Sequence, residues 1–119
     1  MKTTALIGAN DNPEKYAYKA AVSLLRHGHK VILIGNKVGN IIGEEIITDK
    51  PSLDNLDTVT LYINAQNQKE WYNTILNWSP KRIIFNPGTE NPEFESIVKA
   101  HGIEVIQGCT LVMLSIGNY

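Results

Sequence analysis

TALIGANDNPEKYAYKAAVSLLRHGHKVILIGN, residues 4–36, is the stretch that decides the fold. Short β-branched runs lie at its two ends, Ala5–Ile7 and Val31–Ile34, and they are too continuously apolar for strands with one face in water. Between them, apolar residues from Ala17 to Leu25 recur at helical spacing and form one stripe. The stretch therefore predicts a strand, a helix and a second strand of a parallel sheet that is covered on both faces.

The predicted helix has recognisable start and end signals. Asn12 is the expected N-cap, Pro13 the first helical residue and Glu14 an acidic residue of the first turn. Gly28 is well placed to end the helix. The helix N-terminus then follows directly after the loop Gly8–Pro13, to which it presents free backbone N–H groups and its positive dipole end.

The same alternation continues along the chain. Residues Gly35–Leu56 contain several glycines and a proline, and we expect a loop there with a short helical turn at Ser52–Asn55. The further predicted strands are Val59–Ile63, Ile83–Phe85 and Val105–Ile106, and the further predicted helices are Trp71–Trp78 and Phe94–His101.

These elements predict a single α/β domain over residues 1–119, a Rossmann-like, doubly wound three-layer sandwich. Right-handed crossovers between successive strands favour a five-stranded parallel sheet of order 3-2-1-4-5. In such sheets a ligand binds at the carboxyl ends of the strands, where the chain order reverses. We therefore expect the ligand site between the ends of strands one and four.

Composition narrows the class of protein. The chain has 119 residues, 43% of them apolar, and a net charge of −1, which gives no general attraction to nucleic acid or anionic lipid. The N-terminal apolar run is too short for a signal peptide or a membrane span, so we expect a cytoplasmic protein. The single cysteine, Cys109, allows neither an intramolecular disulfide nor a zinc cluster of paired cysteines, and we expect no metal site. The expected partner is a small molecule, and a homodimer stays open.

Asn and Gly are frequent in every segment that follows a predicted strand. Glycine allows close approach of a ligand, and amides donate and accept hydrogen bonds without carrying charge, which suits a polar nucleotide. Both residues are also good turn formers, and that alternative stays open for each single loop. The segments are Gly8–Pro13, Gly35–Gly39, Asn64–Asn67, Asn86–Thr89 and Gly108–Thr110.

The first of these loops, GANDNP at Gly8–Pro13, is suited to a phosphate because it precedes a helix N-terminus. It lacks the further glycines of a GxGxxG motif, so it is a weak dinucleotide signal by itself. After strand two the chain reads Gly35-Asn36-Lys37, where an NAD-binding domain would carry an acidic residue. A cation at Lys37 favours a phosphorylated ribose, as in coenzyme A or NADP.

The order of these motifs resembles the CoA-binding-domain family, small proteins related to the CoA-binding domain of succinyl-CoA synthetase α subunits. The resemblance spans essentially the whole chain, although Asn10 stands where the family usually has Ser. The matching motifs are Gly8–Pro13, Tyr16-Ala17-Tyr18-Lys19, Gly28-His29-Lys30-Val31, Asn36-Lys37, Gly43–Ile46, Pro51–Leu56 and Cys109–Met113.

The resemblance implies coenzyme A, or an acyl-CoA, as the ligand and assigns residues to its parts. Those expected at the diphosphate and adenosine are Gly8, Ala9, Asn10, Asn12 and Pro13, with Tyr16, Tyr18 and Lys19 nearby. Lys37 is expected at the phosphorylated ribose, and Asn36, in the same turn, is expected among the cofactor-binding residues. Those expected along the adenine or pantetheine arm are Asn64, Asn86, Pro87 and Gly88, with Cys109 close to the ligand edge.

No catalytic constellation is recognisable. A nucleophilic cysteine needs a base nearby, whereas topology places His27, His29 and His101 at the amino edge of the sheet, opposite Cys109. A receiver domain would need an aspartate where Asn64 stands, and a flavodoxin would need a hydroxyl-rich first loop. Three functions stay open: a CoA-binding module without chemistry, an NADP-dependent oxidoreductase-like domain, and a Rossmann-like interaction protein with a vestigial pocket.

Overall fold

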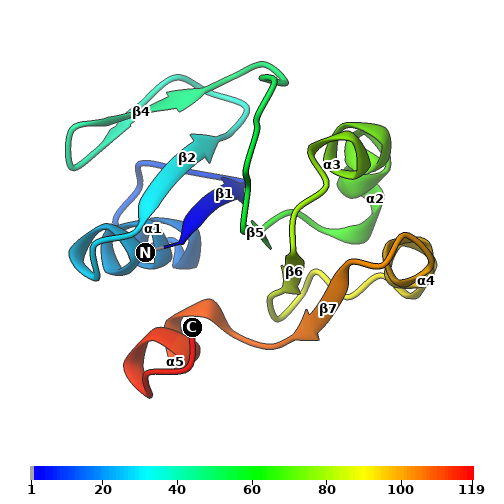
Figure 1. Cartoon of the computed structure of the whole chain (residues 1–119). Coiled ribbons are helices and arrows are strands. Elements are labelled where there is room, and N and C mark those ends of the chain that lie inside the picture. Colours follow the sequence, from blue (N-terminus) through cyan, green and yellow to red (C-terminus); the bar gives the residue numbers. More distant parts are fainter. Residues whose placement is uncertain (1) are drawn as a thin grey trace.

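The computed structural model describes residues 2–119 as a mostly parallel sheet with helices on both faces (Figure 1). The strands are β1 (Thr3–Ile7), β2 (Lys30–Ile34), β3 (Asn40–Ile41), β4 (Glu44–Ile47), β5 (Thr58–Leu61), β6 (Arg82–Phe85) and β7 (Glu104–Gln107). The helices are α1 (Tyr16–Arg26), α2 (Ala65–Gln68), η1 (Lys69–Trp71), α3 (Tyr72–Trp78), α4 (Pro92–Ala100) and α5 (Thr110–Ser115). The α/β class is thereby confirmed.

The strand order differs from the expected one. The sheet has seven strands in the order β3-β4-β2-β1-β5-β6-β7, so the predicted five-stranded order 3-2-1-4-5 is wrong. All neighbours pair in parallel except β3 and β4, which are antiparallel. When only the parallel strands are numbered, the order is that of the six-stranded dinucleotide-binding sheet. The chain therefore reverses between β1 and β5, and this is where the ligand crevice is expected.

The error arose in the segment Gly35–Leu56, which holds a β-hairpin rather than a loop. Ile41 and Ile46 of β3 and β4 are buried against the sheet, and the turn between them is closed by the Asn40 side chain, which accepts a 2.8 Å hydrogen bond from Gly43 N–H. β4 takes the place beside β2 that the prediction gave to the strand near Val59, and pushes that strand to the other side of β1. The helical turn predicted at Ser52–Asn55 is also wrong, because those residues form no helix.

The two faces of the sheet carry separate apolar cores, as the alternation of buried residues along β1 shows. Leu6 packs under α1 and α5, whereas Ala5 and Ile7 pack under η1, α3 and α4. On the α1 side, the small residues Ala17, Ala20 and Ala21 let the helix lie close to the sheet, as the predicted stripe required. Both faces are therefore covered, and the carboxyl edge between α1 and α2 carries the loops that can hold a ligand (Figure 1).

Helix α1 starts later than predicted. The Asn12 side chain accepts a hydrogen bond from Glu14 N–H (3.0 Å) and closes a separate turn. Lys15 is extended and occupies the N-cap position, so the helix begins at Tyr16 rather than at Pro13. The predicted end at Gly28 is confirmed, because Gly28 has φ +82° and donates to Leu25.

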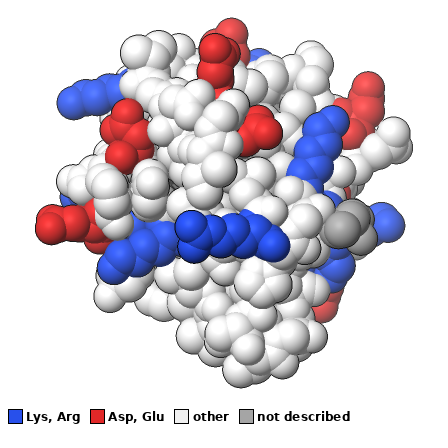
Figure 2. Space-filling model, turned by 90° about the vertical axis from the view of Figure 1, so that its left-hand side faces the viewer, with Lys and Arg blue, Asp and Glu red and all other residues white. Residues whose placement is uncertain are grey.

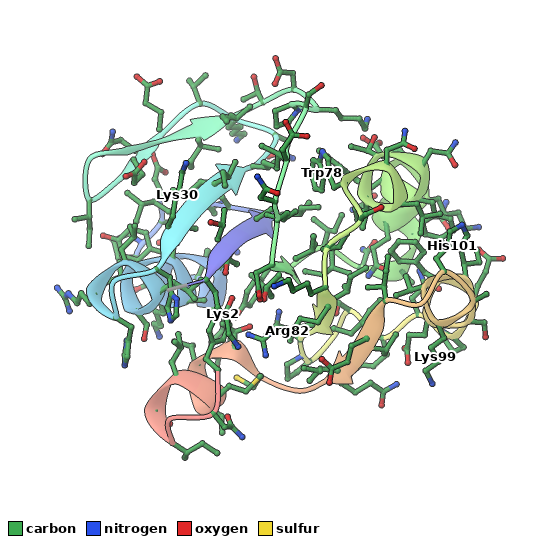
Figure 3. All side chains as sticks on the ribbon, in the orientation of Figure 1. Lys2, Lys30, Trp78, Arg82, Lys99 and His101 are labelled. Carbon is green, nitrogen blue, oxygen red and sulfur yellow. The ribbon has the colours of Figure 1, made fainter. Side chains whose placement is uncertain are left out.

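The opposite, amino edge of the sheet is closed by side chains. The Arg82 guanidinium lies 4.5 Å from the centre of the Tyr119 ring, and Lys2 donates to the Tyr119 main chain at 2.6 Å. Figure 3 shows Lys2 and Arg82 close to one another beneath β1 and β6. His29 lies at this same edge, its ring 4.9 Å from that of Tyr119, so the amino edge is occupied by protein groups.

Candidate functional site

The loop after β1 is held against the loop after β5 at the point where the strand order reverses. Gly8 has φ +101°, and a Cβ atom there would lie 2.7 Å from the Tyr62 carbonyl oxygen. Only glycine satisfies both conditions, because other residues rarely adopt this φ and any Cβ would collide with the backbone. Gly8 therefore brings the ends of β1 and β5 together.

The backbone N–H groups of this loop are only partly free. Gly8 and Ala9 both donate to the Ile34 carbonyl, at 2.8 and 2.9 Å, and so tie the loop to the end of β2. The next turn of chain differs: within residues 2–119 the N–H groups of Tyr16 and Ala17 have no hydrogen-bond acceptor. The donors that can receive an anion thus lie in the first turn of α1 rather than at the glycine.

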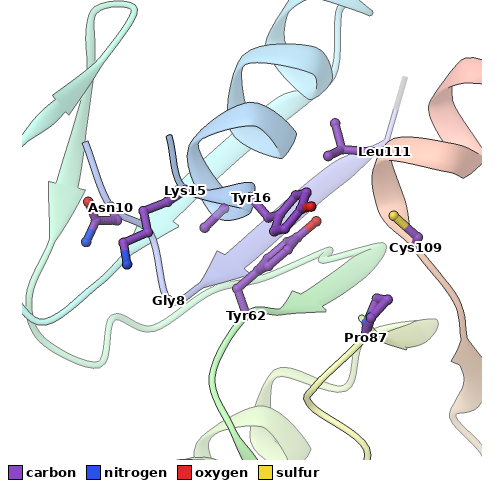
Figure 4. A pocket seen from close by; sticks show the side chains of 9 residues that line it. Gly8, Asn10, Lys15, Tyr16, Tyr62, Pro87, Cys109 and Leu111 are labelled. Atoms are coloured by element: carbon purple, nitrogen blue, oxygen red, sulfur yellow. The ribbon is translucent and has the colours of Figure 1, made fainter. Parts of the chain in front are cut away.

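A cavity of about 620 Å³ lies between α1, α5 and the ends of β5 and β6 (Figure 4). Its wall is mostly apolar or aromatic, and of the described residues that line it only Lys15 is charged. We call it the apolar lobe; it is lined by Gly8, Asn10, Lys15, Tyr16, Ala17, Tyr62, Pro87, Cys109 and Leu111. Its volume is in the range of ordinary ligand pockets.

A second cavity, of about 750 Å³, lies on the β2 and β4 side of the same loop. We call it the polar lobe, because amide, hydroxyl and charged groups form much of its wall. The lining residues are Ile7, Gly8, Ala9, Asn10, Ile34, Gly35, Asn36, Thr48, Asp49, Lys50, Tyr62, Ile63, Asn67, Glu70 and Trp71. Gly8, Asn10 and Tyr62 line both lobes, so the two cavities flank one loop.

Among residues 2–119, Lys50 is the only lysine or arginine that lines the polar lobe. Its ammonium lies 3.1 Å from a Glu70 carboxylate oxygen and 4.9 Å from the centre of the Trp71 ring. Both charged side chains of the pair are substantially exposed, so the pair contributes little to stability and can rearrange when an anion binds. Asp49 adds a second carboxylate to this lobe.

Tyr62 is the residue of the site whose polar group is left without a partner. Its hydroxyl is shielded from water. The Thr110 hydroxyl lies near it but pairs with Thr60 at 2.8 Å, and no atom of residues 2–119 meets the geometry of a hydrogen bond with the Tyr62 hydroxyl. Burial raises the pKa of Tyr62 well above its ordinary value, and the neighbouring Cys109 thiol adds to the shift. The hydroxyl therefore stays protonated and available as a donor at neutral pH.

Seven of the residues predicted from the sequence line one or both lobes: Gly8, Ala9, Asn10, Tyr16, Asn36, Pro87 and Cys109. Three others, Pro13, Tyr18 and Lys19, line a separate, shallow cavity of about 500 Å³ on the outer side of α1. The remaining five, Asn12, Lys37, Asn64, Asn86 and Gly88, line none of these three cavities. Lys37 is exposed, and Lys50 is the cation of the polar lobe.

Two of these asparagines have structural hydrogen bonds instead. Asn64 accepts from Asn67 N–H at 2.9 Å and caps α2. Asn86 is fully buried: its amide nitrogen donates to Thr60 (2.7 Å) and to the Leu61 carbonyl (2.8 Å), and its amide oxygen accepts from Thr110 N–H (2.9 Å). The turn-forming alternative therefore accounts for Asn64, whereas Asn86 is a buried amide that links β5 to the start of α5.

Sequence reasoning missed Lys15, Lys50, Tyr62 and Trp71. Tyr62 directly follows the last residue of β5, and that position was the available signal for it. Lys50 follows β4, the strand that the prediction lacked, so no sequence pattern marked it. Trp71 was interpreted as a core residue only, although it also lines the polar lobe.

The histidines lie where topology predicted. His27 and His101 cap the C-termini of α1 and α4, and His29 directly precedes β2, whereas Cys109 follows β7 at the carboxyl edge. Burial and nearby cations lower the pKa of His29. Among the described residues no three His, Cys, Asp or Glu side chains come together in a way that could hold a metal ion.

Charged side chains of both signs lie on the face next to β3, β4 and α1 (Figure 2). Figure 2 shows this face, on which a row of Lys and Arg side chains crosses the middle and acidic side chains lie above and beside it. No helix of residues 2–119 is long and apolar enough to cross a membrane.

Comparisons with known proteins show the family and the fold of the chain. A crystal structure of an uncharacterized protein shares 53% identity with the chain at a TM-score of 0.98, covering 100% of this chain and 98% of that one. A Thermus thermophilus protein (22% identity, TM-score 0.82, 99% and 90% coverage) and a hypothetical Pyrococcus horikoshii protein (23%, 0.83, 97% and 82%) share the fold. No curated protein matches the chain. The model of the CoA binding domain matches residues 2–115, and the chain therefore belongs to the CoA-binding-domain family.

Proposed function

We propose that the protein binds coenzyme A or an acyl-CoA across the loop after β1. The observation that carries this proposal is the pair of lobes, one polar and one apolar, that share Gly8, Asn10 and Tyr62. Coenzyme A has the matching chemistry: a charged, hydrogen-bonding adenosine phosphate at one end and a less polar pantetheine arm at the other, joined by a diphosphate.

The diphosphate is assigned to the first turn of α1. The N–H groups of Tyr16 and Ala17 lack acceptors within residues 2–119, and the Lys15 side chain lines the same lobe. An anion there is stabilised by these donors, by the helix dipole and by the lysine charge. Asn10, which lines both lobes, lies between the two arms of the ligand.

The adenosine is assigned to the polar lobe, because in this fold the ribose lies beyond the end of the second strand. Gly35 and Asn36 follow β2 there, and the Trp71 ring lines the same space. Asp49 or Glu70 can accept a hydrogen bond from the one free ribose hydroxyl of CoA. Lys50 can reach a phosphate on the ribose, while the exposed Lys37 remains the prediction from the sequence.

The pantetheine arm is assigned to the apolar lobe, between Tyr16, Pro87 and Leu111, with its sulfur end near Cys109. We propose a binding module without chemistry of its own, because the histidines lie at the other edge of the sheet. NADP is the alternative ligand, since Lys50 would serve its ribose phosphate as well. A nicotinamide would then have to occupy the apolar lobe.

Isothermal titration calorimetry with CoA, acetyl-CoA, dephospho-CoA, NAD, NADP and ATP tests the proposal. The expected result is one-to-one binding of CoA or acetyl-CoA, tighter than that of any ligand without a pantetheine arm. Binding of NADP alone would favour the oxidoreductase-like alternative. No binding of any of these ligands would favour the vestigial pocket of an interaction protein.

A further inference from the structure

The hydroxyl of Tyr62 is buried in the wall of the apolar lobe without a hydrogen-bond partner among residues 2–119. A buried polar group left unpaired costs about 1–3 kcal/mol, and native proteins rarely retain one. Such a group at a ligand site points to a partner that the ligand supplies. Tyr72 shows the contrast: its hydroxyl donates to Glu93 at 3.0 Å and accepts from Asn91 at 2.9 Å.

The surroundings of the hydroxyl define what that partner must be. Figure 4 shows the Tyr62 ring extending from the sheet edge towards the space beside Tyr16, Leu111 and Cys109. The polar groups beside it are already engaged or weak: the Thr110 hydroxyl pairs with Thr60 at 2.8 Å, the Tyr16 side chain is exposed, and the half-buried Cys109 thiol is a weak hydrogen-bonding group. A protonated phenol in such a wall requires a strong acceptor from the ligand, and a carbonyl oxygen is one.

We infer that Tyr62 selects an acylated ligand, by donating a hydrogen bond to the thioester carbonyl of an acyl-CoA. This inference rests on the proposed function and goes further, because it distinguishes acyl-CoA from free CoA. The thiol of free CoA offers only a weak acceptor, so it leaves the Tyr62 hydroxyl unpaired. The thioester carbonyl oxygen of an acyl-CoA accepts a hydrogen bond from this hydroxyl.

The hydroxyl is shielded in this structure, so a ligand reaches it only when a neighbouring side chain moves, and Tyr16, which lies beside it in Figure 4, is an exposed neighbour that can do so. Tyr16 is the first residue of α1 and is 71% exposed, and its ring lies 5.4 Å from the Lys19 ammonium. An exposed side chain changes rotamer at little cost. A shift of Tyr16 opens the Tyr62 hydroxyl to the acyl end of the ligand without disturbing the core.

The test compares acetyl-CoA with CoA by calorimetry on the wild-type protein and on Tyr62→Phe. We expect the wild type to prefer acetyl-CoA, and the substitution to reduce that preference by about threefold to tenfold, the value of one hydrogen bond. Tyr72→Phe is the matched control, since it removes a phenol hydroxyl away from both lobes and should leave the ratio of the two affinities unchanged.

A second readout separates ligand recognition from a structural role. Without ligand, Tyr62→Phe should unfold at the same temperature as the wild type or a higher one, because it removes an unpaired buried hydroxyl, whereas Tyr72→Phe should unfold at a lower one. Equal affinity of the wild type for CoA and acetyl-CoA, or an unchanged ratio in Tyr62→Phe, would overturn the inference and leave CoA binding standing. Binding of neither ligand would overturn the proposed function and the inference with it.

Discussion

The two lobes beside the loop after β1 differ in how their polar groups are paired. In the polar lobe the Lys50 ammonium already has a partner, the Glu70 carboxylate at 3.1 Å, in an exposed pair that can exchange with water or ligand. In the apolar lobe the Tyr62 hydroxyl has no partner in residues 2–119 and no access to water. The polar lobe can therefore accept several polar groups, whereas the apolar lobe imposes one specific requirement on its ligand.

Gly8→Ala should have the largest effect, because Gly8 lies in the loop between the two lobes. The new Cβ would meet the Tyr62 carbonyl at 2.7 Å in a backbone of φ +101°. We expect a loss of about 3 kcal/mol in the free energy of unfolding and loss of CoA binding. Gly43→Ala is the control, with a similar φ of +81° but open space around the position. It should cost only about 1 kcal/mol and leave binding intact, and equal losses in the two variants would contradict this role of Gly8.

Asn86→Ala should disturb the apolar lobe more than the polar one. The Asn86 amide oxygen accepts a hydrogen bond from the N–H of Thr110, and the two neighbours of Thr110 in the chain, Cys109 and Leu111, line the apolar lobe. The substitution leaves the Thr110 N–H without an acceptor. We expect a loss of about 2–3 kcal/mol in stability by urea unfolding. The affinity for CoA should fall more than the affinity for ADP, and a parallel fall of both would show that Asn86 acts on the whole fold.

The helix α1 and the strand β4 show which parts of the fold could be predicted from the sequence. The strand–helix–strand unit around α1 was predicted because apolar periodicity and Gly28 mark it locally. β4 was missed because it is short and half of it, Glu44 and Glu45, is exposed and charged, so its pairing with β2 comes from tertiary contacts.

The residues of the candidate site also fall into two groups, those that a local sequence signal identifies and those that it does not. Gly8 and Asn10 could be identified because a glycine and a polar residue after the first strand are local signals. Lys50 could not, since its place in the site depends on β4 becoming a neighbour of β2, and Tyr62 was missed although it directly follows a strand. Asn86 was predicted as a ligand residue but has structural hydrogen bonds, because no local pattern distinguishes a buried structural amide from one that contacts a ligand.

Lys50→Ala and Lys37→Ala sharpen the assignment of the polar lobe. If the polar lobe holds a phosphorylated ribose, Lys50→Ala should lower the affinity for CoA about tenfold and leave dephospho-CoA almost unaffected. Lys37→Ala should then have a much smaller effect, because Lys37 is exposed and lines neither lobe. The same selective loss in Lys37→Ala instead would restore the prediction from the sequence. Titration of both ligands into both variants decides between them.

The smallest expected effect is on the free energy of unfolding at alkaline pH. Because burial raises the pKa of Tyr62, the unfolded chain loses this proton near pH 10 while the folded protein keeps it. Unfolding then releases a proton, so stability should fall as the pH rises above 10, by about 1 kcal/mol near about pH 11 from this residue. Tyr62→Phe should show a shallower fall in chemical unfolding between pH 9 and about 11. An identical slope would mean that the hydroxyl is not desolvated.

The central claim is that one CoA molecule occupies both lobes, and a pair of reporters tests it directly. Trp71 fluorescence reports on the polar lobe, measured in Trp78→Phe protein because the two rings lie 6.0 Å apart, and protection of Cys109 from alkylation reports on the apolar lobe. CoA should change both signals with one midpoint, ADP only the fluorescence, and pantetheine only the protection. A CoA titration that changes one signal alone, or both with different midpoints, would contradict the claim.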